Sequence, residues 1–71
     1  MSSRVAVKSG YYFEIFSKDE IPKTLVNTGI KVTLKDNVYD LYKATNLEDE
    51  RKIDDMFGDQ MGYDIDEHIT D

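Results

Sequence analysis

The feature that most constrains the fold is a stretch of alternating apolar and polar residues with one turn in its middle. Residues 30–45 read IKVTLKDNVYDLYKAT. Successive side chains of a strand point to opposite faces, so this pattern is typical of a half-buried β-hairpin. Asp36 and Asn37 belong to the types that tolerate the positive φ angles of a two-residue turn, and we therefore place the turn at these two residues.

The position of the turn fixes which residues face one another across the hairpin. Lys35 should face Val38, and Val32 should face Leu41. With this register the apolar residues share one face, whereas a shift of one residue would place apolar groups opposite polar ones. The side chains expected on the apolar face are Ile30, Val32, Leu34, Tyr39 and Leu41.

Two segments nearer the N-terminus also have the composition of strands. Residues 4–8 (RVAVK) place both valines on one face, and residues 11–17 (YYFEIFS) are rich in aromatic and β-branched types. Ser9 and Gly10 between them predict a tight turn. Both faces of the second segment carry apolar side chains, so we expect another element or a second chain to cover one of them.

The clearest helix is predicted at about residues 46–57. Thr45 and Glu48 have the spacing of a capping box, and Gly58 is a typical residue for ending a helix. At about 100° per residue, three apolar side chains fall on one stripe. These side chains are Ile53, Met56 and Phe57.

The remaining segments are expected to be shorter and less regular. Residues 17–29 predict a connection, with a helical turn capped by Ser17 and Glu20 as one option. Residues 62–71 predict either a strand or a frayed end. The inward side chains of that strand would be Tyr63, Ile65 and Ile69.

Together these elements predict a single α+β domain spanning residues 1–71. Its core would be a small antiparallel sheet made of hairpin 30–45 and one or two strands within residues 4–17. One or two short helices would accompany the sheet, and the helix at about 46–57 would be the acidic one.

Charge divides the chain into two parts. Residues 1–45 contain seven basic and five acidic residues, a net charge of +2, whereas residues 46–71 contain two basic and ten acidic residues, a net charge of −8. A near-neutral body with a strongly acidic C-terminal third favours a basic partner. Direct binding to nucleic acid or to an anionic membrane is disfavoured, because both would repel this part.

The composition also argues against catalysis and against a bound cofactor. The chain has one histidine and no cysteine, and it lacks a phosphate-binding glycine loop, a nucleophile elbow and an HExxH motif. We therefore predict a protein that is not an enzyme and that needs no metal or cofactor. The missing cysteines fit a reducing cytoplasm, and no apolar run approaches the roughly 18 residues of a membrane span.

The acids of the predicted helix do not follow the pattern that favours helix stability. Two of them have favourable partners, in the pairs Glu48–Lys52 and Arg51–Asp55. Other acids repel each other at i,i+4 or lie near the helix C-terminus, where the helix dipole disfavours anions. Residues 48–59 carry a net charge of −4 over about 18 Å of helix, a density within a factor of two of one DNA strand.

The C-terminal acids permit two interpretations. Asp64, Asp66 and His68 alternate, so a strand would turn all three to one side and could offer them to a divalent ion. The EF-hand loop pattern is missing, however, and a solvent-exposed polar face is the better explanation. We prefer to see Asp64 and Asp66 as phosphate substitutes that continue an acidic surface starting at Glu48.

The runs LEDERKIDDMFGDQ (47–60) and YDIDEHITD (63–71) resemble the small acidic DNA-mimic proteins that bacteriophages use against host DNA-binding proteins. Within that group the chain is most similar to phage inhibitors of the nucleoid-associated HU protein. The resemblance implies a host-takeover inhibitor that occupies the basic DNA-binding surface of HU in the bacterial cytoplasm. The residues expected to meet Arg and Lys of the target are Glu48, Asp49, Glu50, Asp54, Asp55, Asp59, Asp64, Asp66 and Glu67.

An alternative hypothesis assigns binding to the aromatic strand. Residues 11–16 would then serve a small adaptor or structural module as its contact, or would form a homodimer contact, and the acids would only supply solubility. Aromatic residues in a small sheet are more often core and cross-strand partners. This alternative predicts binding that is insensitive to salt.

Overall fold

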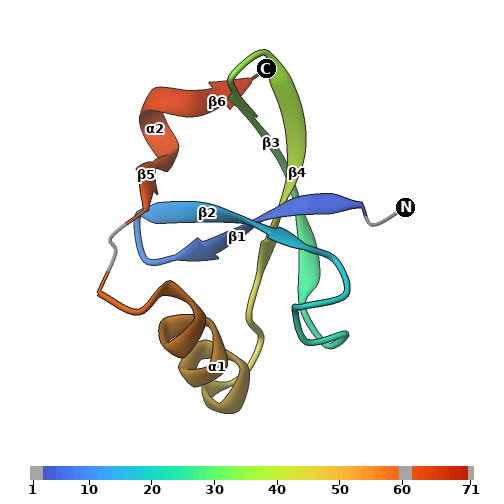
Figure 1. Ribbon diagram of the computed structural model, residues 1–71, viewed down its shortest axis with the longest axis vertical. Coiled ribbons are helices and arrows are strands. Elements are labelled where there is room, and N and C mark those ends of the chain that lie inside the picture. Colours follow the sequence, from blue (N-terminus) through green and yellow to red (C-terminus); the bar gives the residue numbers. More distant parts are fainter. Residues whose placement is uncertain (1–2, 60–61, 71) are drawn as a thin grey trace.

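The computed structural model describes residues 3–59 and 62–70 and shows an α+β fold built on a curled, mixed sheet (Figure 1). The order of strands in the sheet is β5-β2-β1-β4-β3-β6. The elements are β1 (Arg4–Ser9), β2 (Tyr12–Ser17), β3 (Val26–Leu34), β4 (Asn37–Lys43), α1 (Leu47–Phe57), β5 (Tyr63–Asp64), α2 (Ile65–His68) and β6 (Ile69–Thr70).

The α+β class is confirmed, but the sheet is not purely antiparallel. The two hairpins β1–β2 and β3–β4 are joined through β1 and β4, which run parallel with Ala6 beside Leu41 and Val7 beside Tyr42. Strands β2 and β3 therefore run in the same direction, and residues 18–25 cross back between them. Alternation of side chains is the same in parallel and antiparallel strands, so the sequence pattern carries no information on this point.

The predicted hairpin exists, but its register is shifted by two residues. Leu34 pairs with Asn37 and Val32 pairs with Tyr39, so the turn residues are Lys35 and Asp36 rather than Asp36 and Asn37. Both turn residues have positive φ, at 51° and 67°. A shift of two leaves every side chain on its predicted face, and for that reason the apolar pattern did not distinguish the two registers.

Alternation along β1 builds two hydrophobic clusters, one on each face of the sheet. Val5 and Val7 face α1, whereas Ala6 faces the other side. The first cluster consists of Val5, Val7, Ile21, Leu25, Ile53 and Phe57. The second consists of Ala6, Phe13, Val32, Leu41 and Ile65. The two apolar faces of β2 are both used, because Phe13 belongs to the second cluster and Phe16 packs against Phe57 of α1.

Helix α1 follows the predicted bounds, and its first turn has a different cap. The side chain of Asn46, not Thr45, accepts a hydrogen bond from the backbone N–H of Asp49 at 2.8 Å. The predicted stripe packs inward, with Ile53 and Phe57 buried and Met56 half-buried. Gly58 ends the helix at a φ of 64°, and its N–H donates to the carbonyl of Asp54.

The connection before β3 contains turns and no helix in residues 17–25, so the helical option at Ser17 is wrong. Within β3 itself, Asn27 pairs with Tyr42 and Lys31 with Asp40, and residues 28–30 bulge opposite Leu41. The bulge turns Ile30 outward, to 41% exposure, and this corrects its predicted place on the apolar face.

Two backbone donors of the bulge are bound by neighbouring side chains. The N–H of Gly29 donates to Asn27 Oδ1 at 2.8 Å, and the N–H of Ile30 donates to Thr28 Oγ1 at 3.2 Å. The same Thr28 hydroxyl donates to the carbonyl of Leu41 at 2.8 Å. The strand thus satisfies its irregular backbone with polar side chains of its own.

The C-terminal segment is neither one continuous strand nor a frayed end over residues 62–70. It forms two short strands around the single helical turn α2, and Asp71 lies outside the described residues. Ile65 is buried as predicted, whereas Tyr63 and Ile69 are partly exposed at 37% and 43%. In the part of the chain that the structure describes, every helix is too short or too polar to cross a membrane.

Candidate functional site

The exposed acids of α1 are fixed in direction by the apolar stripe on its opposite side. Because Ile53 and Phe57 must face the sheet, Glu48, Glu50, Asp54 and Asp55 are turned to solvent. Asp59 follows the helix and is exposed too. The predicted surface acids of this helix are therefore displayed on an ordered element, with one exception.

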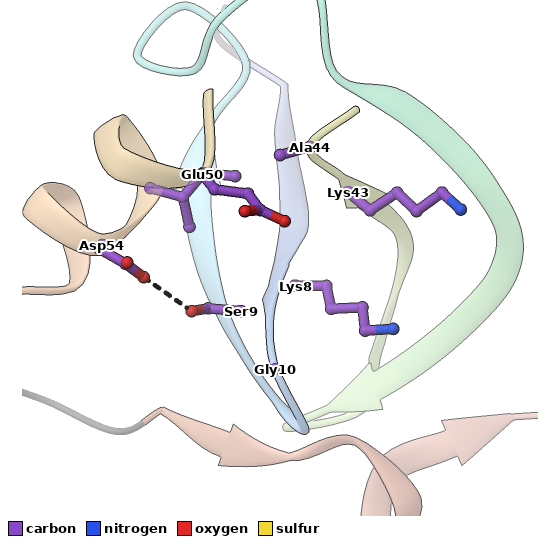
Figure 2. Close-up of a pocket in the computed structure, with 8 residues that line it drawn as sticks. Lys8, Ser9, Gly10, Lys43, Ala44, Glu50 and Asp54 are labelled. Atoms are coloured by element: carbon purple, nitrogen blue, oxygen red, sulfur yellow. Dashed lines mark hydrogen bonds between the residues drawn. The ribbon is translucent and has the colours of Figure 1, made fainter. Parts of the chain in front are cut away.

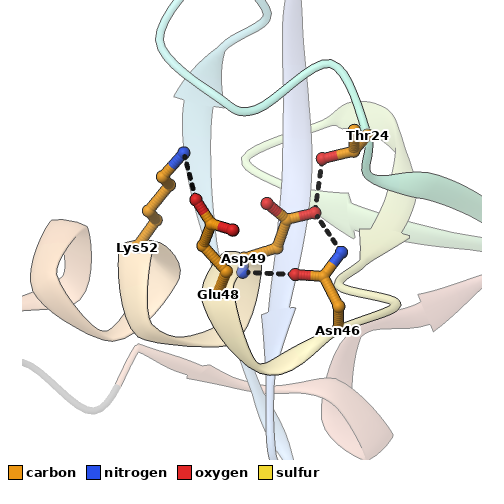
Figure 3. Close-up of polar contacts among 5 residues, drawn as sticks. All are labelled: Thr24, Asn46, Glu48, Asp49 and Lys52. Atoms are coloured by element: carbon orange, nitrogen blue, oxygen red, sulfur yellow. Dashed lines mark hydrogen bonds and ion pairs between the residues drawn. The ribbon is translucent and has the colours of Figure 1, made fainter.

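Asp49 is that exception, and it leaves the set of residues that can meet a partner. Its side chain is only 4% exposed. Its carboxylate accepts hydrogen bonds from the hydroxyl of Thr24 and, at 3.2 Å, from Asn46 Nδ2 (Figure 3). Asp49 thus ties α1 to the connection between β2 and β3, and we correct its predicted role from partner contact to internal anchor.

Replacing Asp49 by alanine should lower the free energy of unfolding by about 1–3 kcal/mol, because the Thr24 hydroxyl and the Asn46 amide lose their acceptor in a part-buried site. Urea unfolding followed by circular dichroism measures this loss. Asp55→Ala on the exposed side of the same helix is the matched control and should change stability by no more than about 0.5 kcal/mol. Equal effects of the two substitutions would contradict the anchoring role.

The outermost face of α1 is balanced in charge rather than purely acidic. Glu48 and Asp55 lie there with Arg51 and Lys52, beside the exposed Leu47. Lys52 Nζ lies 3.8 Å from Glu48 Oε1, which confirms one predicted ion pair (Figure 3). The other predicted pair, Arg51–Asp55, is not formed at ion-pair distance in the structure. This face does not present an unbroken row of anions.

One flank of α1 borders a cleft of about 340 Å³, which we call the mixed-charge cleft. Its lining residues are Lys8, Ser9, Gly10, Lys43, Ala44, Glu50, Ile53 and Asp54. Asp54 is held in place by the hydroxyl of Ser9, which donates to its Oδ1 at 3.1 Å (Figure 2). The side chains of Lys8 and Lys43 run away from α1 (Figure 2), so the charged groups on the helix side of this hollow are those of Glu50 and Asp54.

Neither lysine was among the predicted site residues. Lys8 and Lys43 lie far apart in sequence and come together only because β1 and β4 are parallel neighbours, with Val7 beside Tyr42 one position earlier. No short-range spacing in the sequence predicts that Lys8 and Lys43 are neighbours. The parallel strand pairing was the missing information.

The C-terminal acids occupy the turn of α2 instead of one face of a strand. The carboxylate of Asp64 caps this turn by accepting the N–H of Asp66 at 2.9 Å, and Asp66 and Glu67 are exposed. His68 Nδ1 lies 2.8 Å from the carbonyl oxygen of Asp64 and donates to it. The alternating strand that would have offered Asp64, Asp66 and His68 to a metal ion, or two carboxylates at phosphate spacing, is therefore not formed.

The acids of α1 and α2 do not form the continuous surface that we predicted. Figure 1 shows the two helices toward opposite ends of the longest axis of the molecule, with the β1–β2 hairpin between them. The principal extents of the fold are 30, 27 and 21 Å. The acidic C-terminal third is thus displayed as two separate groups.

The aromatic strand of the alternative hypothesis is mostly occupied inside the protein. Phe13 is fully buried, with its ring centroid 5.6 Å from that of Tyr63 and 5.5 Å from that of His68. Phe16 packs against Phe57 at 5.6 Å. Tyr11 is 82% exposed and Tyr12 is half-buried, so these two aromatic side chains of the segment remain accessible to a partner.

No relative is found for this chain. Comparison with models of protein families, with curated protein sequences and with solved structures gives no match. Function is therefore inferred from the geometry and charge of the chain itself.

Proposed function

We propose that this chain is a non-enzymatic, phage-type DNA-mimic inhibitor that binds the basic DNA-binding surface of a bacterial host protein and so blocks DNA binding. The nucleoid-associated HU protein is the first target to test, because the sequence resembles HU inhibitors. The contact residues would be the predicted acids without the buried Asp49.

One observation carries this proposal: in the described residues of the C-terminal third, most exposed acids have no cationic partner. Among the acids that the structure describes there, only Glu48 is in an ion pair, with Lys52. The exposed acids without such a pair are Glu50, Asp54, Asp55, Asp59, Asp66 and Glu67. A basic surface would supply the missing partners, because Arg and Lys bind carboxylates much as they bind phosphates.

The exposed acids lie on folded elements, and this supports a defined complex that competes with DNA more than it supports non-specific electrostatic attraction. Acids carried on the folded backbone of α1 and α2 lose less backbone freedom on binding than acids of an unfolded segment would, which favours affinity. Electrostatic attraction of this kind speeds association and weakens steeply with added salt. The proposal thus predicts rapid, salt-sensitive binding that excludes DNA.

Neutralising Asp54, Asp55 and Asp59 together to asparagine should weaken displacement of fluorescent duplex DNA from purified HU by about tenfold or more at low salt, because three charge-assisted contacts are lost. Asp19, Asp36 and Asp40 offer a control triple with the same change in charge outside the acidic third. That control should change displacement by less than about twofold. If the two triples behave alike, net charge and not a polarised surface is responsible.

The adaptor hypothesis gains less support, since two of its aromatic residues make internal contacts: Phe13 is buried and Phe16 packs against Phe57. A pull-down from bacterial lysate separates the two ideas without assuming the target. A partner of the DNA mimic should elute with added duplex DNA and with a salt step, whereas a partner of the aromatic strand should resist both.

A further inference from the structure

We propose that Tyr11, at the tip of the β1–β2 hairpin, stacks on an arginine side chain of the basic target and anchors the complex. This inference rests on the proposed function, because the arginine belongs to the DNA-binding surface that the acids would occupy. It deepens that function by naming the basic side chain that is recognised, and it adds an uncharged residue to a set of contacts that otherwise consists of acids.

The fold gives no reason for an aromatic side chain at this position. Ser9 pairs with Tyr12, so Gly10 and Tyr11 are the two central residues of the hairpin turn. Gly10 has a φ of 63° and supplies the positive φ that such a turn needs at its first central position. At 82% exposure, Tyr11 is the most exposed of the large apolar side chains that the structure describes. A side chain with this little internal contact is available to a partner.

On one side, the hairpin tip contacts an acid of α1. The hydroxyl of Ser9 donates to Asp54 Oδ1 at 3.1 Å, and Figure 2 shows the carboxylate of Asp54 directed from α1 toward this end of β1. Asp54 is exposed and, in the described part of the chain, is in no ion pair. The side chain of Lys8 runs away from α1 (Figure 2). A carboxylate without a cationic partner thus lies against the strand end that leads to Tyr11.

On the other side, the tip is hydrogen-bonded to the start of α2. The backbone N–H of Ile65, the first residue of α2, donates to the carbonyl oxygen of Tyr11 at 3.0 Å. Asp66 and Glu67 follow in the same helical turn, and both are exposed. Figure 1 shows the tip of the hairpin between α1 and α2. Tyr11 therefore lies between the two separate groups of acids.

The charge around Tyr11 indicates a cation as its occupant. Residues 9–17 and 53–71 contain no lysine or arginine, so the hairpin tip and the acidic segments that contact it lack a basic residue of their own. Carboxylates on both sides create a negative potential that attracts a basic side chain. The face of a tyrosine ring also attracts cations, because its π electrons make that face negative. The ring and the acids thus favour the same class of side chain.

Arginine fits this arrangement better than lysine does. Its guanidinium group is planar and can stack on an aromatic face while its N–H groups donate to neighbouring carboxylates. Lysine carries a compact, strongly hydrated charge that stacks less well. Tyrosine and arginine are also among the residue types enriched in side chains that contribute strongly to binding. A stacked arginine would let the inhibitor distinguish between basic surfaces, which carboxylates alone do less well.

Substitution of Tyr11 tests the stacking without any change in net charge. The probe is purified HU bound to fluorescent duplex DNA. We expect Tyr11→Ala and Tyr11→Leu to displace DNA about fivefold less well than the original chain or worse, because neither offers an aromatic face, and Tyr11→Phe to stay within about twofold. Val38→Ala is the control, since this residue is 55% exposed and lies outside both groups of acids. It should also stay within about twofold.

Each other result overturns the inference in a recognisable way. Undiminished displacement by Tyr11→Ala would show that the ring makes no contact. Displacement retained by Tyr11→Leu but lost by Tyr11→Ala would indicate an apolar contact without stacking, and loss in Tyr11→Phe would indicate the hydroxyl. Binding that depends on Tyr11 but resists added salt would favour the adaptor hypothesis. Failure of the original chain to displace DNA would instead remove the proposed function toward HU, and this inference with it.

A measurement on the unmodified chain guards against misfolding of the variants. In a chain labelled at tyrosine, the NMR signals of the Tyr11 ring are those missing from the spectrum of Tyr11→Phe. We expect these ring signals to shift when HU is added, because a guanidinium group comes to lie on the ring. Ring signals that stay unchanged while HU binds would overturn the inference and leave the proposed function standing.

Discussion

Gly62→Ala is expected to destabilise the fold by about 2–5 kcal/mol, the sum of backbone strain at positive φ and overpacking. Gly62 has a φ of 86°, and an added Cβ would lie 2.6 Å from the carbonyl oxygen of Phe13 and 3.1 Å from Phe57 Cε2. A chain of this size has only about 4–11 kcal/mol of total stability at typical values per residue. Urea unfolding should therefore show a large fall in the midpoint.

Gly29 provides the matched control for this substitution. Its φ of 83° is nearly the same, but an added Cβ there meets no atom within 4 Å. Gly29→Ala should thus lower the free energy of unfolding only by the backbone strain at positive φ, which is about 1–2 kcal/mol. If both variants lose the same free energy of unfolding, the close approach of Gly62 to Phe13 and Phe57 does not contribute to the effect.

Phe13→Ala should have an equally large effect, about 3–5 kcal/mol, because it empties the centre of the second cluster. Phe13 is fully buried and contacts the rings of Tyr63 and His68. Tyr63 lies in β5 just before α2, and His68 is the last residue of α2. We therefore also expect the amide hydrogens of α2 to exchange faster in the variant. Thermal unfolding and hydrogen exchange measure the two effects.

Tyr11→Ala is the control, since this neighbouring aromatic is 82% exposed. It should change stability by no more than about 0.5 kcal/mol. The pair also probes the adaptor hypothesis: loss of salt-resistant partner binding in the stable Tyr11→Ala variant would favour the aromatic strand. A Phe13→Ala variant as stable as the original chain would contradict the packing around α2.

Local patterns predicted the elements better than their pairing. Helix α1, its apolar stripe and its end at Gly58 follow from short-range spacing, and each is found in the structure. The hairpin turn was misplaced by one residue, because alternation fixes faces and leaves register open in steps of two. Lys35 has a φ of 51°, and lysine is not a residue type that is typical of turns.

The errors in the candidate site have similar causes. Asp49 lies three residues after Asn46, and Glu67 lies three after Asp64, so both segments had the spacing of a helix cap. That spacing was the available sign that Asp49 has an internal role and that the tail begins a helical turn. The meeting of Lys8 with Lys43 had no such sign, because it depends on the pairing of two distant strands.

The bulge in β3 has a consequence for how this chain behaves when it is crowded. Val26 and Ile30 are exposed on a long strand whose outer edge, within the described residues, pairs with β6 at Lys31 and Val32. Such an edge would ordinarily be a template for aggregation. Here the N–H groups of Gly29 and Ile30 are already bound to Asn27 and Thr28, and a passing strand finds neither donor free. These two donors of the bulge are therefore not available to an added strand.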